Sequence, residues 1–347
     1  MKKYAYFLFI IFFIISCFEE KNSKKKMNSL NKEISNIEKI TKKIRNNPKN
    51  SLLFSERAKL FFKKNEINNA INDINIALKL DSLNANFYIE LSEYELIKGK
   101  SGKSKDILEK CIKIYPNHKE ANLKLGQIYL YVKDYKKSIK IFNKVQKICE
   151  KKEKINFKEI AEIYFLKSII FEETKDTTKA IKNLQIAIEN NPKYYEAISK
   201  IAFLFMKKRP EIAIEYYKKA MEIMPKSIEV NYNLALIYQN QKKFSEAIGK
   251  YNFIIENIDS TYYQAFFNIG FINSEFLKKN KIAIENFTKA IKFNENYVSA
   301  YYKRGNCFEK IGKKQYAKRD YLKAMEILPN YSKSIESLNR LENNTEQ

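Results

Sequence analysis

The feature that most constrains this chain is a small residue that recurs about every 34 positions. The spacing stays between 33 and 35 residues, except for eight extra residues between Gly126 and Ser168. The members of this series are Ala58, Ser92, Gly126, Ser168, Ala202, Ala235, Gly270 and Gly305. A period of this length is typical of repeat proteins, in which no unit buries its own apolar face and stacking supplies the core.

The residue types within one period predict pairs of helices. The 347 residues include only 7 Gly and 6 Pro, too few for a fold with many tight turns. Small residues such as Ala317 and Ala324 let two helices approach closely, and aromatic residues such as Phe308 and Tyr321 fill the space between units. Pro329 then ends the second helix of the last unit, because its ring clashes with a helical turn.

These patterns resemble the tetratricopeptide repeat, most clearly in "YNLALIYQNQKKFSEAIGKYNFII" at 232–255 and "AYYKRGNCFEKIGKKQYAKRDYLKAMEILPN" at 300–330. The resemblance implies an all-α fold: an α-solenoid of about eight helix-turn-helix repeats forming a right-handed superhelix. It covers residues 51–331. The expected repeats are 51–84, 85–118, 119–152, 161–194, 195–227, 228–262, 263–297 and 298–331.

Capping segments are expected on both sides of this array. Residues 30–48 predict an N-terminal capping helix, and residues 332–347 a C-terminal capping helix and tail. Residues 153–160 interrupt the period between the third and fourth repeats. They lengthen a helix there, either as a bend or ligand contact or as a tolerated insertion. Pro210 is expected in the first turn of a second helix.

The N-terminus predicts a lipoprotein signal. Lys2 and Lys3 precede an apolar run over 4–15, which is shorter than the roughly 20 residues of a membrane-spanning helix. The sequence Ile-Ile-Ser-Cys at 14–17 resembles a bacterial lipobox, which implies a signal peptide over 1–16, a lipidated Cys17 and a flexible tether over 17–29. We therefore expect a lipid-anchored protein of the bacterial cell envelope, at the outer membrane, with its face undetermined. The alternative is a signal anchor with an incidental cysteine.

The net charge of +25 permits two interpretations. A strongly basic chain suits an acidic partner, either nucleic acid or an anionic membrane surface. Abundant Lys, Asn, Ile, Tyr and Phe are also what an AT-rich genome encodes. The lysines are spread along the whole chain, which favours codon bias, and no nucleic acid partner is expected.

The sequence offers little chemistry for catalysis. It contains no GxGxxG, GxxxxGK[ST], HExxH or GxSxG motif, and its four cysteines include no CxxC pair. His118, the one histidine, follows a Pro-Asn pair and is expected in a surface turn, while Cys111 is expected in the core. No cofactor, metal site or enzymatic activity is therefore predicted. A disulfide between Cys111 and Cys149 is left open.

In the repeats that this chain resembles, the first helix lines a concave groove with residues at positions 2, 5, 9 and 12. The positions that match give a predicted partner-binding groove of Phe165, Phe203, Tyr232, Phe267, Phe271, Tyr302, Asn306, Glu162, Glu196 and Glu229. The alternative for the aromatic residues is packing against neighbouring repeats. The alternative for the glutamates is stabilisation of a helix N-terminus through the helix dipole.

Two functions fit such a groove. The first is a non-enzymatic, lipid-anchored scaffold that docks an extended peptide or a helix of a partner protein. The alternative is a surface lipoprotein that captures a glycan or peptide on the groove aromatics. Binding of acidic chaperone C-termini is set aside, because the resemblance would require a lysine at position 5 and no repeat has one there. The oligomeric state is not specified by the sequence.

Overall fold

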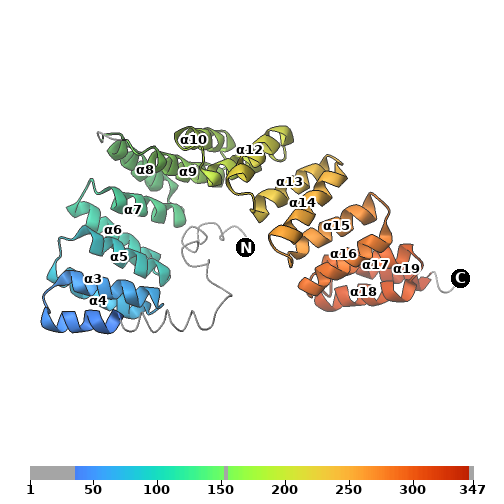
Figure 1. The fold of residues 1–347 in the computed structure, drawn as a ribbon, viewed down its shortest axis with the longest axis horizontal. Helices are drawn as coiled ribbons and strands as arrows, with labels where there is room; N and C mark the ends of the chain where they lie inside the picture. The colour runs from blue at the N-terminus through green and yellow to red at the C-terminus, as the bar shows by residue number, and fades with distance from the viewer. Residues whose placement is uncertain (1–35, 152–154, 344–347) are drawn as a thin grey trace. The chain divides into compact units, whose positions relative to one another are not determined.

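The structure, a computed structural model, describes residues 36–151 and 155–343, and every regular element in these ranges is an α-helix (Figure 1). The helices form two compact units, divided after Asn191, which are described separately below. The predicted signal peptide, Cys17 and the tether lie outside the described residues.

The N-terminal unit is a row of paired helices. A helix over 36–46 precedes α3 (Ser51–Lys63), α4 (Ile67–Leu80), α5 (Ala85–Ile97), α6 (Ser101–Ile114), α7 (Lys119–Tyr131), α8 (Tyr135–Glu150), α9 (Phe157–Glu173) and α10 (Thr177–Asn190). Each odd-numbered helix packs on the helix that follows it, and α4, α6 and α8 each pack on the first helix of the next pair. We call the two members of a pair the first and second helix of a repeat.

The C-terminal unit continues the same pattern. It contains α11 (Tyr195–Phe205), α12 (Pro210–Ile223), α13 (Ile228–Asn240), α14 (Phe244–Asn257), α15 (Tyr263–Glu275), α16 (Asn280–Phe293), α17 (Val298–Lys310), α18 (Lys314–Ile327) and α19 (Ser332–Asn343). Sequential contacts run from α11 to α19. The expected all-α fold of stacked helix pairs is confirmed, while the sense of the superhelix stays a prediction.

Local signals explain where the helices begin and end. Several first helices begin after a side chain that caps a backbone amide, as Asn50 does for Leu52 at 3.1 Å. Seven of the eight described turns between first and second helices hold one left-handed residue: glycine at Gly99 and Gly312, asparagine at Asn65 and lysine at four turns. The turn between α11 and α12, which the structure describes in full, holds none. Pro210 opens α12 in the first turn, as the sequence predicts.

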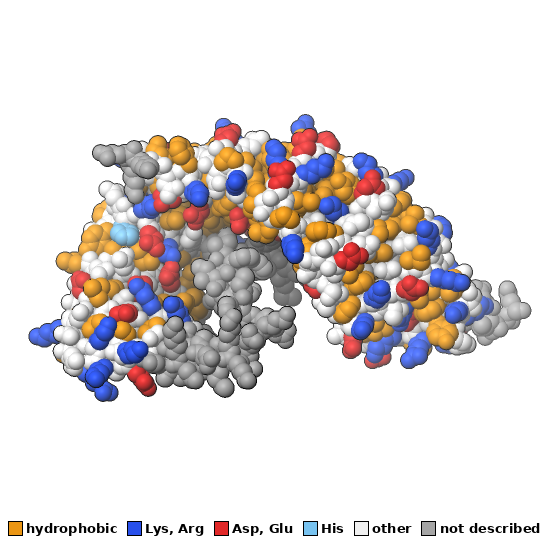
Figure 2. All heavy atoms as spheres, viewed as in Figure 1, with side chains coloured by type: hydrophobic (Ala, Val, Ile, Leu, Met, Phe, Trp, Pro, Cys, Tyr) orange, Lys and Arg blue, Asp and Glu red, His pale blue; other side chains and the backbone are white. Residues whose placement is uncertain are grey.

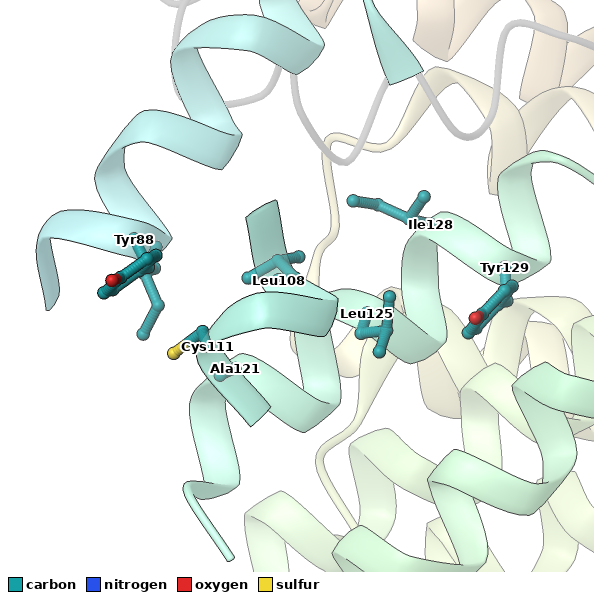
Figure 3. Packing of buried hydrophobic residues seen from close by; sticks show 8 residues of the cluster. Tyr88, Leu108, Cys111, Ala121, Leu125, Ile128 and Tyr129 are labelled. Carbon is teal, nitrogen blue, oxygen red and sulfur yellow. The ribbon is translucent and has the colours of Figure 1, made fainter. Parts of the chain in front are cut away.

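The core lies between consecutive pairs. One cluster joins α5, α6 and α7 through Tyr88, Leu108, Cys111, Leu125 and Ile128 (Figure 3). Cys111 is fully buried, so its predicted core position is confirmed. Within the described ranges no disulfide forms, and the Cys111 and Cys149 thiols remain separate.

Glycines of the first helices accept large rings from the second helices. A Cβ added to Gly270 would stand 2.8 Å from the ring of Phe287, and one added to Gly305 would stand 2.6 Å from Tyr321. Both distances are shorter than any normal carbon contact. The predicted role of small residues in close helix approach is therefore confirmed at these positions.

The helices that flank the arrays bury apolar faces. Ile40 and Ile44 of the helix over 36–46 pack against Phe54 of α3. Leu338 and Leu341 of α19 pack against the ring of Tyr321. Each terminal helix thus covers core that would otherwise face water.

The period break affects the two helices beside it. Helices α8 and α9 have 16 and 17 residues, whereas α7 and α10 have 13 and 14. Helix α9 begins at Phe157, after Asn156 caps two backbone amides. Part of the inserted residues therefore extends the N-terminal end of a first helix.

Candidate partner-binding surface

The residues predicted to bind a partner all lie on first helices. In the N-terminal unit they are on α9, and in the C-terminal unit on α11, α13, α15 and α17. We call the side chains that the first helices present at repeat positions 2, 5, 6 and 9 the first-helix face of each unit. Its composition differs between the two units.

In the N-terminal unit, charged pairs join successive first helices. Glu90 of α5 accepts from Ser55 Oγ of α3 at 2.8 Å and pairs with Lys59 Nζ at 2.9 Å. Lys124 of α7 pairs with Glu93 of α5 in the same way. These carboxylates already have cationic partners, so this face offers fixed charge pairs rather than open anion or cation sites.

The α9 residues of the predicted groove lie largely inside the protein. Phe165 is only 7% exposed, which contradicts its predicted role as a groove anchor. Ser55, Ile89 and Ser199, at the same position of other repeats, are buried as well. Glu162 is half-buried, and burial, followed by the nearby Glu159 carboxylate, raises its pKa, while Lys124 and Lys119 act in the opposite direction.

In the C-terminal unit, three aromatic triads recur with the repeat. In each triad a ring at position 5 of the first helix contacts one ring from the second helix and one from the turn after it. The ring centroids are 4.9 to 5.9 Å apart. The triads are Tyr232 with Tyr251 and Tyr262, Phe267 with Phe287 and Tyr297, and Tyr302 with Tyr321 and Tyr331.

The triads modify the prediction for the position-5 aromatics. Tyr232, Phe267 and Tyr302 are half-buried, so each ring packs within its repeat and leaves part of its surface exposed. Burial raises the pKa of Tyr232, although the amide that Asn268 donates to its hydroxyl at 2.9 Å lowers it. Tyr262, Tyr297 and Tyr331 were missed. Their recurrence at the repeat spacing is a signal that could have identified them.

Three predicted residues are plainly exposed. Phe203 of α11 is 49% exposed, although it is a large apolar side chain on a first helix. Glu196 of α11 and Glu229 of α13 lie in the first turns of their helices and face solvent. This position agrees with stabilisation of the helix N-termini and leaves both carboxylates accessible.

The last two predicted residues lie nearer the C-terminus. Phe271 is half-buried, with the Lys303 ammonium 5.0 Å from its ring centroid. Lys303 also pairs with Glu275 at 2.9 Å. Asn306 accepts a hydrogen bond from the Tyr321 hydroxyl at 2.6 Å, which fixes the orientation of its amide. This face is therefore aromatic and amide-rich.

The described part of the chain holds no cluster of three or more His, Cys, Asp or Glu side chains suited to a metal ion. His118 caps α7, and its Nδ1 accepts from the Ala121 amide at 3.3 Å, so it has a structural role at a turn. Across residues 36–151 and 155–343, no helix is both long and apolar enough to span a bilayer. Basic and acidic side chains are mixed on the visible surface (Figure 2).

Comparison with known families identifies the repeat. The family model of the tetratricopeptide repeat matches four segments, at residues 85–118, 119–152, 161–194 and 298–331. The chain therefore contains tetratricopeptide repeats in both units. Proteins built from such repeats are generally protein-interaction scaffolds.

Individual similarities are more distant. The C-terminal part of a TPR repeat-containing protein from Cytophaga hutchinsonii is 14% identical, with a TM-score of 0.59 over 71% of this chain and 98% of that one. The MamA protein is 23% identical, with a TM-score of 0.45 over 50% of this chain and 95% of that one. An uncharacterized protein, ycf37 of Cyanophora paradoxa, is 28% identical over 106 residues. This match covers 30% of this chain and 60% of that protein's length.

Proposed function

We propose that this tetratricopeptide-repeat chain is a non-enzymatic scaffold that docks a peptide or helix of a partner protein on its first-helix face. The observation that carries the proposal is Phe203, a ring left 49% exposed on a first helix of the C-terminal unit. The exposed edges of Tyr232, Phe271 and Tyr302 supply further apolar surface on the same set of helices. Aromatic anchors of this kind contribute most of the affinity in many protein interfaces.

The fixed positions of the rings in the triads favour binding of a partner without rearrangement of this surface. Because Tyr232, Phe267 and Tyr302 are each held by two other rings, their exposed edges are fixed before a partner arrives. A fixed surface loses little conformational entropy on association. Glu196 and Glu229, exposed beside the aromatic face, would favour a partner segment that carries basic residues.

The second part of the proposal concerns location. The basic start, the apolar run over 4–15 and the lipobox-like sequence before Cys17 support a lipid anchor in a bacterial envelope. The anchor would confine the scaffold to a membrane surface and raise its local concentration there. Metabolic labelling with a fatty acid should label the parent protein and not Cys17→Ala. A soluble, unlabelled parent would rule the anchor out.

Affinity purification from detergent-solubilised membranes tests the scaffold. We compare the parent protein with Phe203→Ala and with Leu322→Ala, a matched control that is also 49% exposed but lies on a second helix. A partner retained by the parent and the control should be lost or reduced about tenfold by Phe203→Ala. Equal recovery by both variants would contradict the proposed surface.

The half-exposed rings also suit stacking against sugars, so glycan capture is the competing function. A glycan array applied to the same three proteins separates the two. Sugar binding that disappears in Phe203→Ala, without recovery of any protein partner, would replace the scaffold with a capture protein.

A further inference from the structure

The turns between first and second helices in the last three repeats are strongly basic. We call the segments 241–244, 276–282 and 310–316 the basic turn edge. They contain no acid and eight exposed lysines: Lys242, Lys243, Lys278, Lys279, Lys281, Lys310, Lys313 and Lys314. None of these eight forms a salt bridge with another described residue.

Contacts between the turns make this edge continuous. The ring of Phe244 stacks on Phe276 of the next turn, with centroids 4.6 Å apart. The turn at 278–282 and Ile311 of the last turn line one open notch of about 370 Å³. The lysines of three repeats therefore belong to one surface.

The acids that border the edge leave its charge largely uncompensated. Glu275 is paired with Lys303 at 2.9 Å, and Glu309 with Arg340 at 2.9 Å. These two carboxylates are thus neutralised by cations outside the edge. Glu246, in the first turn of α14, and Glu285 of α16, four residues after Lys281, are the remaining bordering acids, against eight lysines.

Large apolar side chains are exposed among the lysines. Phe276 is 44% exposed, Ile282 42% and Tyr316 57%, and Leu277 lies beside them at 37%. Polyanions such as nucleic acids use cations and flat rings, and the aliphatic Leu277 and Ile282 have no face on which a base can stack. Lysines interspersed with Phe, Leu and Ile are the composition of surfaces that insert at the boundary between lipid headgroups and acyl chains.

We propose that the basic turn edge binds the surface of a bilayer that contains anionic lipids. The lysines contact lipid phosphates, and Phe276, Leu277 and Ile282 enter the interfacial region. This contact does not depend on a lipid at Cys17 or on the scaffold function. If both were present, the edge would add a second attachment and so restrict the orientation of the C-terminal unit.

Vesicle binding by the full chain carrying Cys17→Ala tests the proposal. The probes are phosphatidylcholine vesicles with and without phosphatidylglycerol, at about 0.1 M and about 1 M salt, where the screening length falls from roughly 10 to 3 Å. The edge variant carries Lys278→Gln, Lys279→Gln, Lys281→Gln and Lys313→Gln. The control variant, of equal net charge, carries Lys218→Gln, Lys226→Gln, Lys289→Gln and Lys333→Gln, all exposed and outside the edge.

We expect the parent and control proteins to prefer anionic vesicles, and the edge variant to bind them at least tenfold more weakly at low salt. Residues 1–35 are identical in all variants, so a difference reports on the substituted lysines. Equal weakening of both variants would show that net charge alone acts. No preference of the parent for anionic vesicles, or no loss in the edge variant, would also overturn the proposal.

Two further measurements keep the result specific. Ile282→Ser should weaken vesicle binding while it leaves binding of a single-stranded oligonucleotide unchanged. Tight oligonucleotide binding without vesicle binding would assign the edge to nucleic acid and refute the proposal. Thermal melts of each variant show that the fold is retained, since all substituted side chains are exposed.

Discussion

At the scale of single residues, Lys167 of α9 is an unusual buried cation. Its side chain is only 6% exposed, and its Nζ donates to Gln146 Oε1 at 2.6 Å and lies 4.9 Å from the ring centroid of Tyr164. The corresponding residues of neighbouring repeats, Leu125 and Ile201, are apolar. Burial lowers the pKa of Lys167 to about 8, while the Glu150 carboxylate opposes the shift.

This pKa predicts a specific pH dependence. Its folded value of about 8 lies below the unfolded value of 10.5, so between these values the unfolded chain binds more protons. Stability therefore rises with pH through this window. Urea unfolding at about pH 7.5 and about pH 9.5 should show the parent gaining about 1–2 kcal/mol relative to Lys167→Met, before the tyrosines ionise. An identical change of stability with pH in the two proteins would contradict the lowered pKa of Lys167.

The aromatic residues show what a sequence pattern leaves undetermined at this scale. Period and phase correctly placed Tyr232, Phe267 and Tyr302 on first helices. They did not determine how far each ring is buried, because that depends on Tyr262, Tyr297 and Tyr331 in the turns that follow. Phe165 was predicted to be accessible but is buried, as are Ile89 and Ser199 at the same repeat position, and the repeat pattern alone does not distinguish buried from exposed residues there.

At the scale of helix pairs, three glycines of first helices lie against large rings of second helices. The first helices with Gly270 and Gly305 face Phe287 and Tyr321, and Gly126 faces Phe142. Where the first helix carries serine, as at Ser92 and Ser168, the second helix carries the smaller Leu108 and Leu184. Ala202 and Ala235 hold the same position in repeats whose second helices carry Tyr217 and Tyr251, so the lack of room for a Cβ belongs to the glycine pairs.

We expect Gly270→Ala to destabilise the protein by about 1–3 kcal/mol, because its Cβ overlaps the Phe287 ring. The double variant Gly270→Ala with Phe287→Leu should recover part of this loss, giving a favourable coupling energy in chemical unfolding. Purely additive effects would show that the glycine is not required by the ring. Gly249→Ala, where no atom lies within 4 Å of an added Cβ, is the matched control.

The turns within the helix pairs offer a test in which a substitution should stabilise the protein. Lys175 holds a φ of 63°, a conformation that costs a residue with a Cβ roughly 1 kcal/mol. Lys175→Gly should therefore raise the free energy of unfolding by up to about 1 kcal/mol, although glycine loses more entropy on folding. Lys182→Gly, in the middle of α10, should lower it by about 1 kcal/mol. Destabilisation by both glycines would contradict the argument from the turn.

At the scale of the whole molecule, the chain is held together by contacts between sequence neighbours. The described helices contact mainly the helix before and the helix after, in each unit. Stability in such an array is a sum of local terms. The all-α class and the repeat phase could therefore be predicted from one sequence, since both depend on local periodicity. The packing of the helices beside the inserted residues and the ring contacts of the triads could not be predicted, because both depend on the shapes of individual side chains.

Because contacts join mainly neighbouring helices, a destabilising substitution should affect only the helices around it. In hydrogen exchange, Gly270→Ala should increase exchange in α15–α18 by about tenfold or more, corresponding to a loss above 1.4 kcal/mol, and leave α5–α8 nearly unchanged. Peptides from both units can be followed in one experiment. A uniform increase along the chain would show that the two units unfold as one.

The buried cysteines can be used to measure how often the region around each of them opens. Cys111 lies in the N-terminal unit and Cys307 in the C-terminal unit, and burial raises the pKa of both thiols to about 11. An alkylating reagent can therefore modify either thiol only when its surroundings open. In a chain carrying Cys17→Ala and Cys149→Ala, the labelling rates of the two remaining thiols would report how often each unit opens.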